Sequence, residues 1–143
     1  MTQENSITKI LVGYDGSRES RRALDFAMSI ANHYDGAEIH VAHVVQKPAG
    51  APDPVPDEVM EALRKAARQT LLEAERAVKK SLGTPVVYLE VGSPGETLLD
   101  LADRIKPGLV VLGTLERPAS ERLLGTVSSS FLRSRRHRLL IVP

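Results

Sequence analysis

The stretch Leu109–Ser130, LVVLGTLERPASERLLGTVSSS, joins an apolar run to a glycine, and a second glycine follows twelve residues later. The apolar run predicts a buried strand, and the segment after the second glycine predicts the start of a helix. Backbone N–H groups at a helix N-terminus attract anions, and glycines let the chain approach a phosphate closely. We therefore expect a site for a phosphorylated ligand that contains Gly113, Gly125, Thr126, Val127 and Ser128. In the alternative interpretation, the two glycines only turn the chain and relieve crowding.

The rest of the chain alternates between strand and helix patterns. Short apolar segments rich in β-branched residues predict strands over 7–14, 37–45, 84–91, 109–113 and 139–142. Apolar residues at helical spacing predict helices over 17–34, 56–82, about 94–105 and about 123–133. This alternation specifies an α/β fold, an open doubly wound parallel five-stranded sheet with four helices on its two faces. The chain, residues 1–143, has the length of a single domain and shows no internal repeat.

The apolar stripes of the helices predict which side chains pack against the sheet. The first helix is expected to bury Leu24, Ala27, Ala31 and Tyr34. The second is expected to bury Val59, Leu63, Ala66, Ala67, Leu71, Ala74 and Val78. The third begins with Ser93-Pro94-Gly95-Glu96, a capping box with proline at the first helical position. We therefore expect the Ser93 side chain to accept a hydrogen bond from an N–H group of the first turn.

Composition excludes several classes of protein. The chain has no cysteine, which rules out disulfides, thiolate metal sites and cysteine nucleophiles. Its four histidines lack the spacing of a helical zinc pair, so no metal site is expected. No apolar run approaches the roughly 20 residues that cross a bilayer, and the N-terminal segment does not resemble a signal peptide. A cytoplasmic location without membrane contact is the expectation.

The C-terminal end of the chain is locally basic. Residues 114–143 hold six arginines against two glutamates, although the net charge of the whole chain is only +1. Such a cluster could attract nucleic acid, but it lacks the interleaved aromatic side chains on which bases stack. We expect a solvated helix end instead, and no nucleic-acid partner.

In an open parallel sheet, ligands bind beyond the carboxyl ends of the strands, at the point where the strand order reverses. Asp15 follows the first strand and Gly113 ends the fourth, so these residues flank one crevice if the two strands are neighbours. The Asp15 carboxylate could then bind a ribose hydroxyl or a magnesium ion. Alternatively, Asp15 only forms the turn before Gly16 and Ser17.

Several segments in a fixed order resemble the universal stress protein family over nearly the whole chain. They are KILVGYDGSRESRRALDFA, AHVV, VGSPGETLLDLA, LVVLGT, LLGTVSSSFLR and LLIVP. The resemblance implies strand order 3-2-1-4-5, the adenine nucleotide alpha hydrolase-like arrangement. It also implies a homodimer through the C-terminal strand and, in one branch of the family, binding of adenine nucleotides. An exposed fifth strand of high β-propensity agrees with pairing to a second copy.

The nucleotide-binding branch carries the pattern G-x2-G-x9-G-[ST] after its fourth strand. Gly113 matches the first glycine and Gly125-Thr126 the last pair, but Glu116 replaces the second glycine and the following spacer is one residue short. The resemblance places Gly13 and Asp15 near the phosphates and ribose, and Val44 near adenine. ATP or AMP is the implied ligand, with magnesium only alongside ATP. The charge of Glu116 predicts weak binding of a triphosphate, unless Arg117 or Arg122 offsets it.

These observations favour a stress-response protein that acts as a dimeric binding or signalling module, with an unidentified protein partner. The alternative is an ATP-binding regulatory protein, or a slow adenine nucleotide hydrolase that uses the crevice between the first and fourth strands. No catalytic residues are assigned, because the strand ends offer neither a Ser/His/Asp set nor paired carboxylates. A binding role is therefore the preferred prediction.

Overall fold

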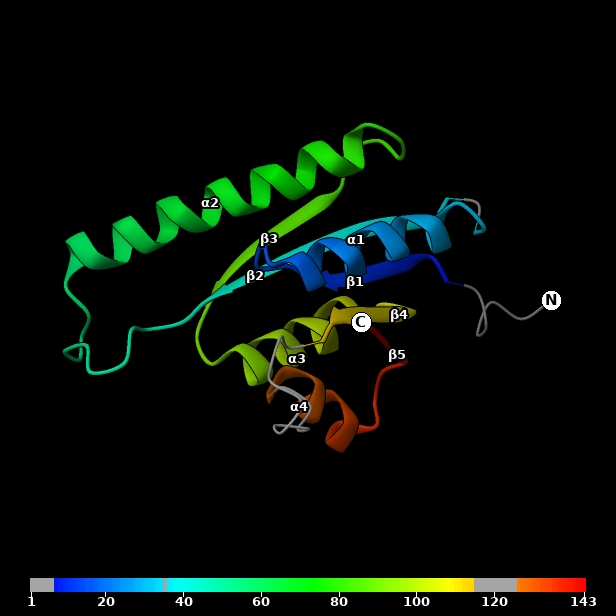
Figure 1. Ribbon diagram of the computed structural model, residues 1–143. Coiled ribbons are helices and arrows are strands. Elements are labelled where there is room, and N and C mark those ends of the chain that lie inside the picture. The colour runs from blue at the N-terminus through cyan, green and yellow to red at the C-terminus, as the bar shows by residue number, and fades with distance from the viewer. Residues whose placement is uncertain (1–6, 35, 115–125) are drawn as a thin grey trace.

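The computed structural model describes residues 7–34, 36–114 and 126–143. Strands and helices alternate along the chain (Figure 1) in the order β1 (Lys9–Gly13), α1 (Arg18–Ala31), β2 (Glu38–Val45), α2 (Asp57–Lys79), β3 (Val86–Val91), α3 (Pro94–Ile105), β4 (Leu109–Gly113), α4 (Thr126–Ser134) and β5 (Leu139–Val142). All strand pairs are parallel, and the sheet order is β3-β2-β1-β4-β5. The α/β class and the strand order expected from the sequence are confirmed.

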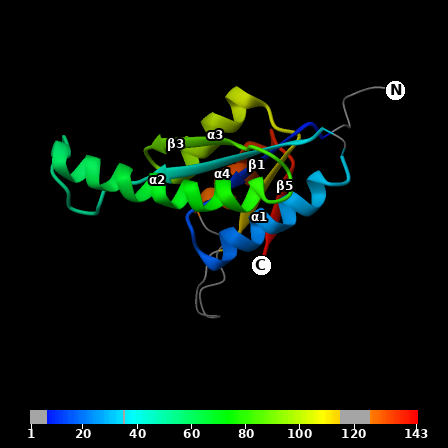
Figure 2. The same ribbon diagram turned by 90° about the horizontal axis from the view of Figure 1, so that it is seen from above.

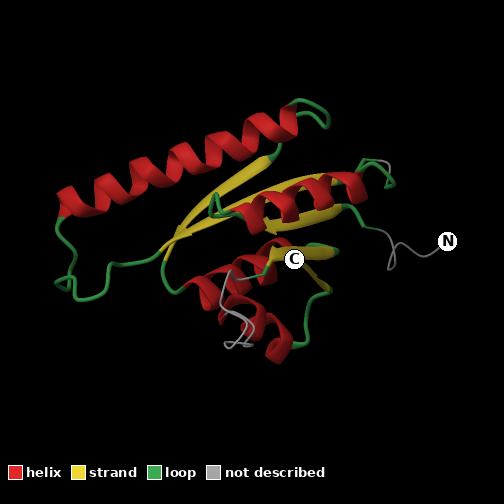
Figure 3. Ribbon diagram, in the orientation of Figure 1, coloured by secondary structure: helices red, strands yellow, loops and turns green. Residues whose placement is uncertain are grey.

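Helices cover both faces of the sheet, so the core has two layers. On one face, Val12, Ile39 and Val111 pack with buried residues of α1 and α2. On the other face, Leu11 and Ala42 pack with α3 and with Phe131 of α4. Figures 1 and 2 show the two helix layers from the front and from above, and Figure 3 shows the strands between them. A strand covered on both faces must be apolar at every position, which explains the continuous apolar runs of β1 and β4.

The ends of several elements differ from the sequence-based prediction. α1 ends at Ala31, so Tyr34 lies beyond the helix and is 38% exposed rather than buried. In α2, Ala67, Leu71, Ala74 and Val78 are buried as expected, but Val59 and Ala66 are exposed. Figures 1 and 2 show the reason: the first turns of α2 extend past the strands and have no sheet to cover them.

The start of α3 also corrects a prediction. Ser93 occupies the N-cap position, yet its side chain makes no capping hydrogen bond. Its carbonyl oxygen accepts a hydrogen bond from the Thr97 N–H at 2.9 Å. The chain reaches this helix through Gly92 with φ +151°, and the Thr97 hydroxyl would clash with a Cβ atom on Gly92. The glycine and Pro94 at the first helical position therefore direct the chain into α3 without a side-chain cap.

None of the described helices combines the length and the apolar character that a bilayer-spanning helix requires.

Candidate functional site

A pocket of about 370 Å³ opens beyond the carboxyl ends of β1 and β4. Its walls come from the end of β1 and the turn after it, the first turn of α1, the end of β2, the start of α3, the end of β4 and the first turn of α4. β2, the next strand in the chain, pairs with β1 on one side, and β4 pairs with β1 on the other side. The pocket thus lies at the topological switch point, where open parallel sheets bind ligands.

Most of the residues predicted for the site meet in this pocket. The lining includes Gly13, Asp15, Val44, Gly113, Val127 and Ser128. Thr126 is the first residue of α4. Gly125 lies outside the described residues, as do Glu116, Arg117 and Arg122. The predicted role of the glycine pattern between β4 and α4 therefore stays a prediction. Asp15 and Gly113 flank one crevice, as expected for neighbouring strands.

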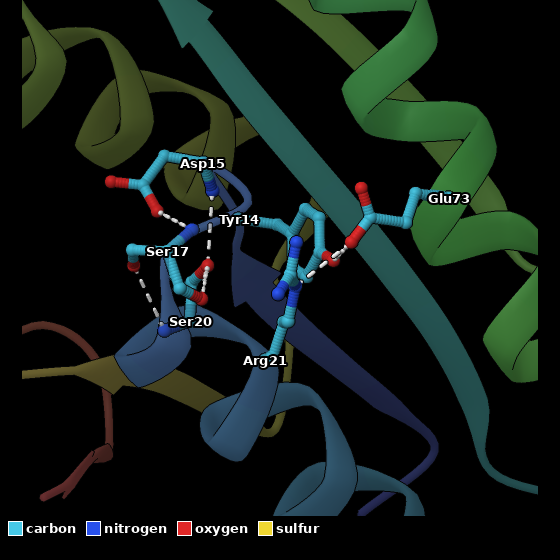
Figure 4. A network of polar contacts seen from close by, with 6 residues as sticks. All are labelled: Tyr14, Asp15, Ser17, Ser20, Arg21 and Glu73. Atoms are coloured by element: carbon cyan, nitrogen blue, oxygen red, sulfur yellow. Dashed lines mark hydrogen bonds and ion pairs between the residues drawn. The ribbon is translucent and has the colours of Figure 1, made fainter.

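A network of short-range hydrogen bonds shapes the turn between β1 and α1 (Figure 4). The Ser17 N–H donates to Asp15 Oδ1 at 2.9 Å, and the Ser20 N–H donates to Ser17 Oγ at 3.1 Å. Ser17 is therefore the side-chain N-cap of α1. The Ser20 hydroxyl donates to the Ser17 carbonyl at 3.1 Å and accepts from the Asp15 N–H at 3.3 Å. Gly16, with φ +83°, supplies the left-handed conformation that this turn needs.

The Asp15 carboxyl group is ionised at neutral pH. Partial burial by itself would raise its pKa, but the hydrogen bonds from Ser17 outweigh that effect and hold the pKa below its usual range. Both interpretations of Asp15 thus have support: it forms the turn, and it presents a charged carboxylate at the pocket wall.

Tyr14 connects the site to the helix layer on one face of the sheet. Its hydroxyl donates to Glu73 Oε1 of α2 at 3.1 Å, and Arg21 Nε of α1 donates to the same oxygen at 2.8 Å (Figure 4). Burial raises the pKa of the Tyr14 phenol. On the pocket side, the Tyr14 carbonyl oxygen accepts a hydrogen bond from His43 Nδ1 at 2.8 Å. Because a carbonyl oxygen can only accept, His43 Nδ1 carries the proton of this hydrogen bond.

The pocket combines an apolar wall with scattered polar groups. Val44, Leu98, Leu112 and Val127 provide apolar surface, whereas Ser17, His43, Gln46, Thr114 and Ser128 provide hydrogen-bonding groups. A mixed lining of this kind is typical of small-molecule sites. Among the described residues, no group of three histidine, aspartate or glutamate side chains could hold a metal ion.

The comparison with known proteins agrees with this geometry. A family model described as "Universal stress protein family" matches residues 6–143. The chain belongs to this family. A universal stress protein of Mycobacterium tuberculosis is 32% identical over 137 residues, which are 93% of this chain and 94% of that protein.

Solved structures of universal stress proteins share the fold. One from Lactobacillus plantarum superposes with a TM-score of 0.82 at 24% identity and covers 96% of this chain and 99% of its own. Another, described as a universal stress protein in complex with cAMP, has a TM-score of 0.65 at 29% identity and covers 96% and 98% of the two chains. The first likeness concerns the fold, and the second shows that a protein similar to this one has been solved with a cyclic nucleotide.

In this universal stress protein, Glu19 is a pocket residue that the sequence analysis missed. It lies in the first turn of α1, lines the pocket and is only 6% exposed. One signal could have found it, since Glu19 shares a helical stripe with Ala23 and Ala27, which are fully buried. A charged residue on that stripe is exceptional, because the stripe packs against the sheet.

Proposed function

We propose that this universal stress protein binds a ligand that contains adenine and ribose in the pocket between β1 and β4. The observation that supports the proposal is the pocket itself, which lies at the switch point and brings together six of the residues predicted for the site. The similar protein described in complex with cAMP supports the same class of ligand.

We assign each part of the ligand to a part of the pocket. Val44 would contact the adenine ring, and the Asp15 carboxylate would accept hydrogen bonds from ribose hydroxyls. Gly13 and the first turn of α4, with Val127 and Ser128, would lie near a phosphate, because the exposed N–H groups of a helix N-terminus favour anions. Magnesium would arrive only with ATP, since Mg²⁺ in proteins is bound by one or two carboxylates together with substrate phosphates.

Calorimetric titration with adenosine, AMP, cAMP and ATP tests this assignment, with and without Mg²⁺. Binding of one of these ligands supports the proposal, and replacing Val44 by Glu should abolish it, because a carboxylate would face the adenine ring. Asp57→Asn, in the first turn of α2 and outside the residues that line the pocket, serves as a control that leaves binding unchanged. Release of phosphate from ATP, measured in the same samples, would indicate the alternative hydrolase function.

We also propose that the protein is a cytoplasmic homodimer paired through β5, which signals to a protein partner. β5 is an edge strand, and its residues Leu139–Val142 are all only half-buried in the single chain. An exposed edge of this kind is usually covered or paired. Light scattering should give twice the mass of one chain, and Leu140→Lys should yield monomers. A monomeric wild-type protein at micromolar concentration would contradict the dimer.

A further inference from the structure

The described lining of the pocket contains acidic side chains but no lysine or arginine. Among its described lining residues, Asp15 and Glu19 carry carboxyl groups, and none is a lysine or an arginine. A pocket built for a polyphosphate normally places cationic side chains on the phosphates. The described wall of this pocket offers a phosphate backbone N–H groups, hydroxyl groups and the His43 and Gln46 side chains, but no lysine or arginine side chain.

The Glu19 carboxyl group lacks the hydrogen bonds that a buried carboxyl group normally makes. Both of its oxygens are buried, and neither has a hydrogen-bond partner among the described residues. Burial of an unpaired carboxyl group lowers the stability of a protein, so its presence needs an explanation. Ser20, the next residue, is equally buried but has three hydrogen bonds.

Glu19 also lies at the end of the pocket where a phosphate would be placed. Its main chain packs against Gly113 at the end of β4, and Val127 and Ser128 of α4 line the same pocket. A carboxylate in this buried position would be poorly screened by water and salt, so it would act strongly on any charge brought beside it. It would oppose the attraction that the N-terminus of α4 exerts on anions.

We infer that Glu19 sets the charge selectivity of the pocket, which takes an adenine nucleoside or a nucleotide with a single phosphate and excludes polyphosphates. This inference rests on the proposed function and adds a residue to it. Each additional phosphate increases the repulsion, so affinity falls from adenosine through AMP to ATP.

Glu19→Gln tests the inference, because the amide keeps the shape of the side chain and removes its charge. Titration calorimetry with adenosine, AMP and ATP, without Mg²⁺, should show the wild-type order of affinities. In the variant, ATP affinity should rise about tenfold while adenosine affinity stays nearly constant. Asp25→Asn removes the same charge from the exposed side of α1, and this matched control should retain the wild-type ratio.

Other outcomes overturn the inference in distinguishable ways. If the ratio of ATP affinity to adenosine affinity is the same in wild type and in Glu19→Gln, Glu19 has no role in selectivity, although the proposed ligand binding stands. A parallel titration with Mg²⁺ that gives tight ATP binding by the wild type and none by the variant would show that Glu19 recruits a cation instead. Binding of no adenine ligand by either protein would overturn the proposed function together with this inference.

Thermal unfolding supplies a readout that does not depend on any ligand. Because the variant replaces an unpaired buried carboxyl group by a neutral amide, its unfolding midpoint should rise by about 3 °C. A lower midpoint would show that Glu19 is satisfied in the free protein and has a structural role, which contradicts the inference.

Discussion

The carbonyl oxygen of Glu19 lies 2.5 Å from the point that a Cβ atom on Gly113 would occupy. The carbonyl carbon lies at the same distance, so the neighbour is main chain and cannot rotate away. The end of β4 and the first turn of α1 can approach this closely only if residue 113 has no side chain. Gly113 thus has a packing role in addition to its place at the pocket.

Replacing Gly113 by Ala should lower the free energy of unfolding by about 3 kcal/mol, because α1 must shift away from β4. Gly50→Ala is the comparison, since a Cβ atom there meets nothing within 4 Å and only the left-handed backbone, φ +78°, opposes the change. Its loss should be about 1 kcal/mol. Urea denaturation of both variants measures the difference. Equal losses would show that β4 and α1 can separate without strain.

Two serines at N-cap positions should respond differently to replacement by alanine. Ser17→Ala should lower stability by about 0.5–2 kcal/mol, because Ser17 Oγ accepts from the Ser20 N–H. Ser93→Ala should leave the denaturation midpoint nearly unchanged, since its side chain makes no capping bond. Similar losses in both variants would mean that Ser93 caps α3 in solution, as the capping-box motif predicts.

The hydroxyl of Tyr14 gives a prediction for alkaline pH. Burial raises the folded-state pKa of this phenol above its ordinary value of 10.0, so folding favours the protonated form. The associated stability is fully present below pH 10 and is lost as pH rises through the folded-state pKa. Tyr14→Phe should lose about 1 kcal/mol at neutral pH and show a smaller alkaline loss. Part of that loss should remain, because burial also raises the pKa of Tyr88.

Asp103 gives the corresponding prediction for acid. Arg136 donates two hydrogen bonds to its carboxylate, at 3.1 and 2.9 Å, and the His137 ring lies 2.7 Å from it. The hydrogen bonds from Arg136, and then the one from His137, lower the pKa of Asp103. The stability they contribute is present above the ordinary carboxyl pKa and is lost as pH falls through the folded-state value.

Asp103→Asn should therefore lower stability at pH 7 by about 1 kcal/mol and reduce its dependence on pH below 4. Circular dichroism during urea titration at pH 7 and pH 3 checks this expectation. Asp25→Asn, outside the cluster, should show no such change. An unaltered acid profile for the Asp103 variant would mean that the surface pairs are fully solvated.

Strands could be predicted well from the sequence because burial on both faces leaves a continuous apolar run, as in residues 109–112. Helix ends were less accurate, since they depend on where the sheet stops. Tyr34 continues the apolar spacing of α1 but lies beyond the end of the helix at Ala31 and is exposed.

The site could be predicted in part. Asp15, Val44 and Gly113 follow strands, and topology alone brings the ends of parallel strands together. Glu19 was missed because a charged residue is expected to face water, whereas its place on the buried stripe depends on how α1 packs. The Ser93 motif specifies residue types but not the side-chain rotation that a capping bond requires.

The extension of α2 past the sheet divides that helix into two parts of unequal local stability. Ala67, Leu71, Ala74 and Val78 attach the C-terminal part to the core, while the turns around Val59 have few buried neighbours. Amide protons of residues 60–66 should therefore exchange with deuterated solvent through local fraying. Those of residues 71–78 should exchange only in larger opening events that expose the core. One continuous helix would thus belong to two cooperative units, with the boundary at the edge of the sheet.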